Sequence, residues 1–297
     1  MPSQVIVPEL TDEVKVEAIN FNSGNDVLTA LVSKSIDIAQ ITYLHYVTAL
    51  DKDFDVIAVS GQVNGGSDVI VANGIDLKPD DWEGFKKLVQ DRLKSGKKLR
   101  IAASRGNAQD IHLRGELLLN GIDPANDVEI INVANAADHA AALQRGEVDA
   151  VSTVEPFASQ IILSGIGKHF TYPYKQAAGN LTNLIVTRSD VIKNNPESVQ
   201  AVVNAVVKLV GELKQDQTKW VESINKITGL DADIAKAALN NAYPDYNMYY
   251  KPTLAIAAMM KDLRYISKDV SDKVGKNMDY RFLEKATGKS KNDLGYQ

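Results

Sequence analysis

The sequence predicts an α/β protein built from two similar lobes, followed by a helical tail. Short apolar segments alternate with amphipathic segments of helical period as far as residue 187, which indicates helices covering mostly parallel sheets. From residue 189 onward only helical periodicity remains. In addition, an Ala-Leu pair followed six residues after the Leu by an Asp occurs twice, at 30–37 and at 142–149. Two copies of one α/β unit suggest two lobes.

The first part of the chain alternates strands and helices, separated by Gly, Asn and Asp turns. After a short segment at 3–12, we expect a loop and helix cap at 22–26. The helix at 80–94 has Trp82, Phe85 and Leu88 on one face, and 95–98 has the composition of a linker. The expected strands are 14–21, 36–41, 55–59 and 67–72, and the expected helices are 27–32, 42–50 and 80–94.

The second part continues this alternation. Asn107 is the expected N-cap of a helix that Gly121 ends, with Asp110 three residues after the cap. Ser152 and Thr153 are candidate N-caps of the helix expected at 157–163. The expected strands are 99–103, 128–133, 148–151, 169–172 and 184–187. The expected helices are 107–120, 136–145 and 157–163, and then 196–215, 217–228, 231–241, 253–266 and 270–274 in the tail.

Composition excludes whole classes of function. The net charge of −5 over 297 residues leaves no excess of Lys and Arg to neutralise a nucleic acid. The absence of Cys removes disulfides, thiolate nucleophiles and Cys-based metal sites. No run of about 18 apolar residues is present, so no membrane span is expected. The first residues lack the basic segment and apolar core of a secretory signal, which leaves a cytosolic protein or a trimmed mature form.

Ligand contacts are expected where strands end, because open α/β sheets bind ligands outside the carboxyl ends of their strands. Such ends lie at 40–43, 61–67, 104–110 and 152–155. The loop at Ser104–Asn107 is the richest of them. Arg105 there either meets an anion or points to solvent, and any single junction of this kind is more often a plain helix cap.

Other chemistries lack support in the sequence. No phosphate-binding or dinucleotide-binding glycine motif occurs, and no Gly-x-Ser-x-Gly nucleophile elbow is present. His112 and Glu116 lie one helical turn apart, and a pair on the helix surface is favoured over a metal site. The tyrosine-rich segment 243–250 is expected to be a packed loop, with the roof of a pocket as the alternative.

Several segments of the sequence resemble a known protein family. Ala142–Phe157 resembles the solute-binding proteins of aliphatic-sulfonate, taurine and nitrate ABC importers, a family that includes thiamine-pyrimidine synthase-like proteins. Further matching pieces are Phe21–Gly24, Ile36–Ala39, Lys98–Ala102 with Gly106, Gly121–Glu129 and Asn277–Lys285. The likeness extends over nearly the whole chain.

The resemblance implies a type II periplasmic-binding-protein-like fold of two lobes with two crossover segments. Lobe 1 would be 1–97 and 176–297, and lobe 2 would be 98–175. The family pattern places the ligand-binding candidates Gln40, Thr42, Tyr43, Gly65, Gly66, Ser67, Ser104, Arg105, Gly106, Asn107, Ser152, Glu155 and Asn180 along the cleft. Glu155 serves either a ligand or the helix start that follows it.

Two features depart from the family pattern. By the family pattern we expect the chain to begin inside the first helix, so that a strand and part of the site would be missing. The full helix at 80–94 replaces what the family often has as a short turn, and would enlarge the surface offered to a partner.

The expected function is that of a substrate-binding protein of an ABC importer, capturing a small anionic solute of the sulfonate, nitrate or taurine kind. Its partners would be this solute and a membrane permease, with the chain acting as a periplasmic or lipid-anchored extracytoplasmic monomer. No catalytic residue, metal or cofactor is expected. The alternative is an enzyme on the same fold, for thiamine-pyrimidine synthesis or desulfination, which the absence of Cys disfavours. A sensory role is a third possibility.

Overall fold

The computed structural model describes residues 14, 16–21 and 23–297, and these form two compact units. Unit 1 contains the described residues up to Gly65 together with Leu181–Ala232 and Ala242–Gln297. Unit 2 contains Gly66–Asn180 and Asp233–Asn241. The expected segment at 3–12 lies outside the described residues.

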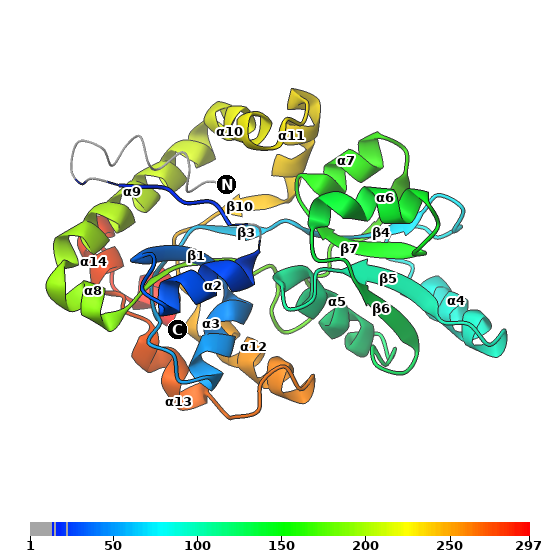
Figure 1. Ribbon diagram of the computed structural model, residues 1–297, viewed down its shortest axis with the longest axis horizontal. Helices are drawn as coiled ribbons and strands as arrows, with labels where there is room; N and C mark the ends of the chain where they lie inside the picture. Colours follow the sequence, from blue (N-terminus) through cyan, green and yellow to red (C-terminus); the bar gives the residue numbers. More distant parts are fainter. Residues whose placement is uncertain (1–13, 15, 22) are drawn as a thin grey trace. The chain divides into compact units, whose positions relative to one another are not determined.

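Unit 2 is built on a five-stranded sheet of order β6-β5-β7-β4-β8 (Figure 1). Its central strand β7 pairs in parallel with β5 and antiparallel with β4, and β4 pairs antiparallel with β8. The sheet is therefore mixed rather than mostly parallel as predicted. The strands are β4 (Ser67–Ala72), β5 (Leu99–Ala103), β6 (Val128–Asn132), β7 (Ala150–Val154) and β8 (Gly167–Thr171).

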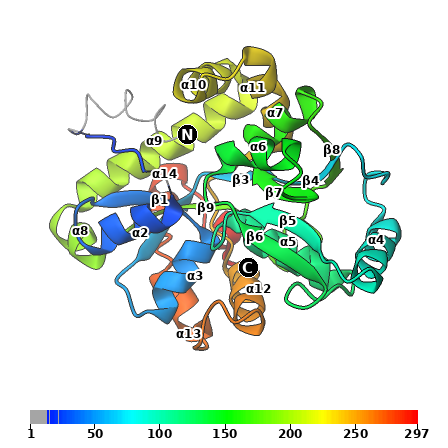
Figure 2. The same cartoon turned by 45° about the vertical axis from the view of Figure 1, so that its right-hand side comes forward.

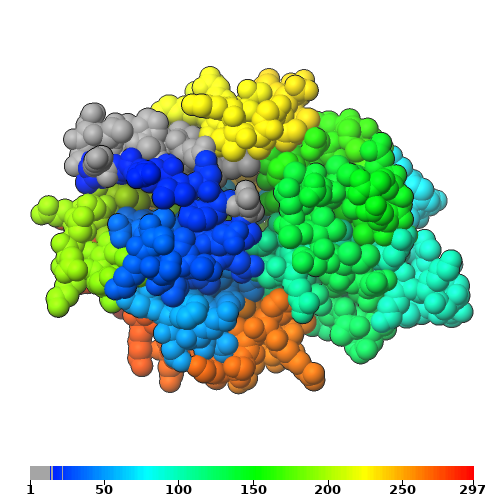
Figure 3. Space-filling model, viewed as in Figure 1, coloured from blue at the N-terminus to red at the C-terminus, as the bar shows by residue number. Residues whose placement is uncertain are grey.

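Helices cover both faces of this sheet (Figure 2). Helices α4 (Trp82–Lys94) and α5 (Ala108–Leu119) bury one face, where Phe85 and Phe170 stack with ring centroids 5.0 Å apart. Helices α6 (His139–Gln144) and α7 (Phe157–Leu163) bury the other face around Ile70 and Val151. The polar side of α4 lies on the surface of unit 2 (cyan in Figure 3).

The domain boundary differs from the predicted one at residues 97 and 98. The strand β4 hydrogen-bonds to β7 and β8, and α4 packs against the face that β4 helps to build, so both belong to unit 2. The chain passes from unit 1 to unit 2 after Gly65 and returns after Asn180. The 95–98 segment is a turn inside unit 2, because strand pairing across the chain outweighs its linker-like composition.

Unit 1 has a three-stranded antiparallel sheet of order β1-β9-β2 and a separate two-stranded ribbon of β3 and β10. Its strands are β1 (Ile38–Thr42), β2 (Ile57–Gly61), β3 (Val63–Gly65), β9 (Asn183–Thr187) and β10 (Ala242–Pro244). The helices of unit 1 are α2 (Gly24–Val32), α3 (Tyr43–Asp51), α8 (Ser189–Asn194), α9 (Pro196–Gln215), α10 (Thr218–Thr228), α12 (Tyr250–Asp262), α13 (Ser271–Val274) and α14 (Arg281–Thr287). Helix α11 (Ala232–Ala238) belongs to unit 2 from Asp233 onward.

Three local predictions need correction or extension. Residues 16–21 form no strand, although their apolar residues alternate, and four of the six are exposed. A strand needs a partner, and in the described sheet β1 pairs only with β9. Helix α14 was not predicted. The tyrosine-rich segment is a packed loop, since β10 pairs with β3 and the Gly61 N–H donates to the Tyr246 carbonyl at 2.8 Å.

Among the described residues, no helix combines the length and the apolar character needed to cross a membrane.

Candidate functional site

In unit 2 the polar loops predicted to bind a ligand meet at one edge of the sheet. Ala103 at the end of β5 lies beside Ser152 of β7, and Val154 at the end of β7 lies opposite Ser67 at the start of β4. The carboxyl ends of β5 and β7 and the first residue of β4 therefore share this edge, which we call the polar edge. It brings together Gly66, Ser67, Ser104, Arg105, Gly106, Asn107 and Glu155.

The serine hydroxyls at this edge make hydrogen bonds within the protein. Ser67 Oγ lies 2.9 Å from His112 Nδ1, and Ser104 Oγ donates to the Val133 carbonyl at 3.0 Å. Both serines are buried. These hydroxyls hold the loops in place rather than stand open to a solute.

Ser152 is not a helix cap. It lies inside β7, fully buried, and its hydroxyl donates to the Gln109 carbonyl at 2.9 Å. The strand extends three residues beyond its predicted end because Val151–Val154 continue the pairing with β4. Helix α7 begins at Phe157 after Pro156, so Ser152 offers no helix N-terminus to a ligand.

The loop before α5 keeps its predicted form. Asn107 occupies the N-cap position, but its side chain makes no capping bond. Instead the Asp110 carboxylate accepts from the Gly106 N–H at 3.1 Å, and Arg105 N–H donates to Asn132 Oδ1 at 3.0 Å. The Arg105 side chain is exposed, and no ion pair or hydrogen bond of its guanidinium is found among the described residues. The first-turn N–H groups of Ala108 and Gln109 have no partner within the helix.

An Arg beside a helix N-terminus favours an anion. The helix dipole places partial positive charge at the first turn of α5, and the planar guanidinium can donate two parallel hydrogen bonds to an oxyanion. The Asp110 carboxylate lies in the same first turn and would repel an anion there. Its negative charge is balanced by Arg114, whose Nε lies 2.8 Å from Asp110 Oδ1.

Gly66 and Asn180 lie near the limits of unit 2. Gly66 has a φ of 87°, which a side chain disfavours, and its N–H donates to the Asn241 carbonyl at 2.7 Å. Its own carbonyl accepts from the Glu155 N–H at 2.8 Å. Asn180 is partly exposed in the connection between β8 and β9.

His112 and Glu116 do not form the surface pair predicted for them. Both are buried, and Glu116 Oε1 accepts from the backbone N–H groups of Lys175 and Gln176. Burial raises the pKa of Glu116, although these backbone donors work against that rise. The pair anchors the segment that follows β8. Within the described ranges no group of three or more His, Cys, Asp or Glu could hold a metal ion.

In unit 1 the candidates Gln40, Thr42 and Tyr43 lie in or directly after β1, and Gly65 ends β3. Thr42 caps α3: its Oγ1 accepts from the His45 N–H at 3.3 Å and lies 2.8 Å from His45 Nδ1. The Tyr43 N–H donates to the Thr182 carbonyl at 2.9 Å, so the start of α3 is already well satisfied. Burial lowers the pKa of His45 to about 4 and keeps its imidazole neutral near pH 7.

The remaining candidates of unit 1 differ in exposure. Gln40 is a partly exposed residue of β1. Tyr43 is buried, and its hydroxyl accepts from the Tyr249 N–H at 3.3 Å. Gly65 is buried with a φ of 84°, and its carbonyl accepts from Thr182 Oγ1 at 2.8 Å. Tyr43 and Gly65 are thus parts of the scaffold.

Gln62 lies within the predicted strand end at 61–67 but is not among the predicted site residues. Its side chain is buried, and neither its Oε1 nor its Nε2 has a hydrogen-bond partner among the described residues. His45 Nε2 is likewise buried without a partner. Buried amides are nearly always hydrogen-bonded, so Gln62 is a candidate for contact with a bound molecule. No sequence pattern predicts unsatisfied atoms of this kind, because they depend on packing by distant segments.

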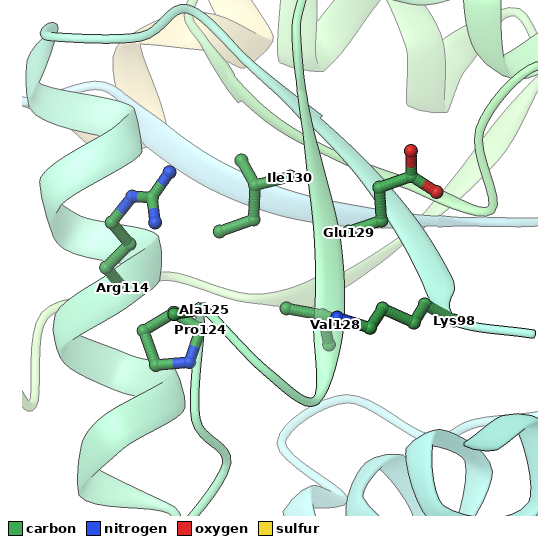
Figure 4. Close-up of a pocket in the computed structure, with 7 residues that line it drawn as sticks. All are labelled: Lys98, Arg114, Pro124, Ala125, Val128, Glu129 and Ile130. Carbon is green, nitrogen blue, oxygen red and sulfur yellow. The ribbon is translucent and has the colours of Figure 1, made fainter.

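A surface hollow of about 480 Å³ lies elsewhere in unit 2 (Figure 4). It is lined by residues next to the amino ends of β5 and β6, and the Arg114 side chain extends from α5 toward Ile130 (Figure 4). It contains none of the predicted ligand-binding residues. The lining residues are Lys98, Arg114, Pro124, Ala125, Val128, Glu129 and Ile130.

Solved structures share this fold. The periplasmic aliphatic sulphonate binding protein SsuA of Escherichia coli aligns with a TM-score of 0.74 and 18% identity, over 93% of this chain and 86% of its own. The periplasmic nitrate-binding protein NrtA of Synechocystis PCC 6803 aligns with a TM-score of 0.78 and 16% identity, over 97% and 85%. The predicted periplasmic-binding-protein fold is confirmed.

Sequence comparison also identifies a relative that is a nitrate-binding protein. A curated relative, the nitrate/nitrite binding protein NrtA of Synechococcus elongatus, is 26% identical over 123 residues, which are 41% of this chain and 28% of the relative. The match therefore spans little more than a quarter of that relative's length. The model of the NMT1-like family matches residues 9–224. Because this match covers well over half of the sequence, the chain belongs to the NMT1-like family.

Proposed function

We propose that this protein is the solute-binding component of an ABC importer and captures a small organic or inorganic oxyanion, such as a sulfonate or nitrate. The observation that carries the proposal is the exposed Arg105 guanidinium beside the first turn of α5 at the polar edge. Two sources of positive potential coincide there, and an oxyanion can accept hydrogen bonds from both.

The ligand groups of unit 1 are neutral. His45 is uncharged at neutral pH, and the Gln62 amide offers one acceptor and two donors. These groups suit the polar atoms of a solute without adding charge. We propose that Arg105 and the first turn of α5 hold the charged end of the solute, and that the buried Gln62 amide of unit 1 is a further group able to contact its polar atoms.

The relatives support this proposal by their names, which describe binding of sulphonate or nitrate in the periplasm. These names favour an extracytoplasmic compartment, and we propose a membrane permease as the partner because another structure with the same fold is named as the ligand binding component of an ABC-type import system. At the polar edge the Ser67 hydroxyl lies 2.9 Å from His112 Nδ1, but both residues are only 1% exposed, which argues against attack of this hydroxyl on a bound solute.

A thermal-shift screen with alkanesulfonates, nitrate and short carboxylates tests the proposal. A ligand that binds only the folded state raises the melting temperature, by an amount equivalent to about 2.7 kcal/mol at a hundredfold excess over Kd. Arg105→Ala should abolish the shift caused by an oxyanion. Arg145→Ala is the matched control, because Arg145 is an exposed Arg of unit 2 that pairs with Glu147 before the start of β7. No shift with any oxyanion at millimolar concentration would contradict the proposal.

A further inference from the structure

Helix α4 carries a basic surface that the proposed solute site does not use. The helix buries Trp82, Phe85 and Val89 and turns its other side to the surface of unit 2 (cyan in Figures 1 and 3). Residues 83–98 contain five lysines and one arginine against two carboxylates, in a chain whose net charge is −5. This segment therefore reverses the overall charge locally. We define the basic face by its residues, all of which are at least partly exposed: Lys86, Lys87, Leu93, Lys94 and Lys97.

The ion pairs of this segment leave lysine charge available to a partner. Arg92 is engaged by Asp149 at 3.3 Å and does not belong to the basic face. Asp91 is shared between Lys87 Nζ, at 3.9 Å, and Lys94 Nζ, at 3.5 Å, and all three side chains are more than half exposed. Exposed pairs of this kind are weak and are easily exchanged for another anion.

Two further carboxylates border the basic face. Glu83 lies in the first turn of α4, where the helix dipole favours a negative charge. The pKa of Asp123 is lowered first by the hydrogen bond from the Ala125 N–H, at 2.8 Å, and also by the charge of Lys98. Lys98 is thus balanced by Asp123 and is not counted in the basic face. With Glu83 and Asp91 counted, the lysines of the basic face still leave a net positive charge.

Exposed leucines lie among these lysines. Lys86 and Leu93 are seven residues apart, which is close to two helical turns, so they share one side of α4. Leu93 is 36% exposed. A Cβ built on Gly121 would lie 3.1 Å from Lys86 Nζ, which places this ammonium beside the end of α5. The last two residues of α5, Leu118 and Leu119, are 45% and 59% exposed, so apolar and basic side chains alternate over this part of unit 2.

This composition fits a lipid bilayer better than a protein partner. Protein–protein interfaces are depleted in lysine, whose charge is costly to desolvate. Lysines that surround exposed leucines are typical of surfaces that lie in the headgroup region of a bilayer, where the ammonium groups meet phosphates and the leucines reach the acyl boundary. The flexible lysine stems also need no fixed geometry of the phosphates that they contact.

We propose that the basic face docks on the surface of a bilayer that contains anionic phospholipids and so holds the protein close to the membrane. The turn after Lys94 and Lys97 leads into β5 at Leu99, and β5 ends at Ala103 beside the polar edge. This end of the basic face and Arg105 therefore lie at opposite ends of one strand. Docking on lipid leaves the polar edge free, and it goes beyond the proposed capture of a solute.

Flotation of the whole protein with protein-free vesicles tests the inference. Vesicles of phosphatidylcholine alone are compared with vesicles that also contain about 30 mol% phosphatidylglycerol, at about 20 mM and about 300 mM salt. The anionic vesicles should bind at least about fivefold more protein at low salt, and high salt should remove most of this difference. A triple variant of the basic face should lose binding severalfold: Lys87→Gln, Lys94→Gln and Lys97→Gln.

A matched triple variant of unit 1 changes the net charge by the same amount at exposed lysines and should bind as the wild type does: Lys226→Gln, Lys251→Gln and Lys261→Gln. Because the chain has no Cys, a single labelled Cys reports the orientation. A polarity-sensitive fluorophore at Gln90→Cys, on the exposed side of α4, should shift to the blue with anionic vesicles, whereas one at Gln217→Cys in unit 1 should not.

Three results would overturn the inference. They are equal binding to neutral and anionic vesicles, equal loss in the two triple variants, and a fluorescence shift at Gln217→Cys without one at Gln90→Cys. No binding to anionic vesicles at low salt would overturn it as well and leave this face to a protein partner or to solvent. The proposed function is tested separately, since the thermal shift caused by an oxyanion should be the same in the triple variant of the basic face as in the wild type.

Discussion

The carboxylate of Asp149 holds the start of β5 through Arg100. Asp149 Oδ2 accepts from the backbone N–H of Arg100 at 2.9 Å and from its Nε at 3.2 Å, while Arg92 Nη2 donates to Oδ1 at 3.3 Å. Asp149 is therefore a structural residue at the end of the sheet opposite the polar edge. The internal repeat that contains Asp149 therefore marks scaffold, and the proposed ligand contacts lie beyond the strand that follows it.

This contact predicts a specific pH dependence. Burial favours the neutral form of Asp149, but the bonds from Arg100 prevail and lower its pKa below 3.8. Its stabilisation is thus complete above about pH 4 and is lost as the pH falls through the lowered pKa. We expect Asp149→Asn to lower the free energy of unfolding by about 2 kcal/mol at pH 7. Urea unfolding should show this difference shrinking below pH 4, and an unchanged difference at pH 2.5 would refute the assignment.

Glu155 and His169, which is hydrogen-bonded to Asp68, predict the opposite trend near neutral pH. The pKa of Glu155 is raised from 4.5 to about 7 by burial, so its ionisation costs stability as the pH rises through this interval. The raised pKa of His169 acts in the same direction, because its stabilising charge is lost as the pH rises through the folded value. We expect the melting temperature to fall between pH 5.5 and pH 8.5.

Glu155→Gln tests that trend, since the amide cannot ionise. The variant should show a shallower fall over this range and be more stable than the wild type at pH 8.5. Glu129→Gln, at an exposed position on β6, should follow the wild-type curve. Parallel curves for wild type and Glu155→Gln would show that Glu155 does not titrate in this interval.

Replacing either of two glycines of unit 1 by alanine should change the stability of the protein in opposite directions. A Cβ at Gly61 would overlap the Asn247 carbonyl oxygen, whereas a Cβ at Gly211 on α9 would meet no atom within 4 Å. Gly61→Ala should cost stability by backbone displacement, on the order of 2 kcal/mol. Gly211→Ala should add up to about 1 kcal/mol, because Ala favours a helix interior. Chemical denaturation measures both, and equal effects would contradict the packing described.

The aromatic packing of unit 2 predicts that one substitution to alanine lowers the free energy of unfolding strongly and that another leaves it almost unchanged. Phe85 is fully buried between Trp82 and Phe170, with ring centroids 5.4 and 5.0 Å away. Phe85→Ala should lower the free energy of unfolding by about 3–5 kcal/mol. Leu119→Ala, at a 59% exposed residue of α5, should change it by less than about 0.5 kcal/mol. Similar values for the two variants would contradict this core.

The sequence predicts the fold class and most elements because local periodicity and caps decide them. Helix α9 has its predicted bounds, Thr42 and Asn107 occupy cap positions, and β5 is found where expected. Pairing partners are different, since they depend on segments far apart in the chain. Because β4 pairs antiparallel with β7, β4 belongs to unit 2 and the observed domain boundary differs from the predicted one. The same pairing extends β7 through Ser152, and the local sequence pattern does not predict it.

The candidate site could be predicted only as loops at strand ends. Those loops do meet at the polar edge of unit 2, but Ser67, Ser104 and Ser152 use their hydroxyls within the protein. Asp68 and His169 are 101 positions apart and meet only through the pairing of β4 with β8. Gln62 is distinguished only by unsatisfied atoms in a packed interior.

The central claim, that the protein captures an oxyanionic solute without converting it, is tested most directly by calorimetric titration of the wild-type protein with the best compound of the thermal-shift screen. We predict one solute per chain, a Kd below about 10 µM, recovery of the compound unchanged, and loss of the signal in Arg105→Ala but not in Arg145→Ala. Absence of saturable binding, or the same affinity in Arg105→Ala as in the wild type, would contradict the account.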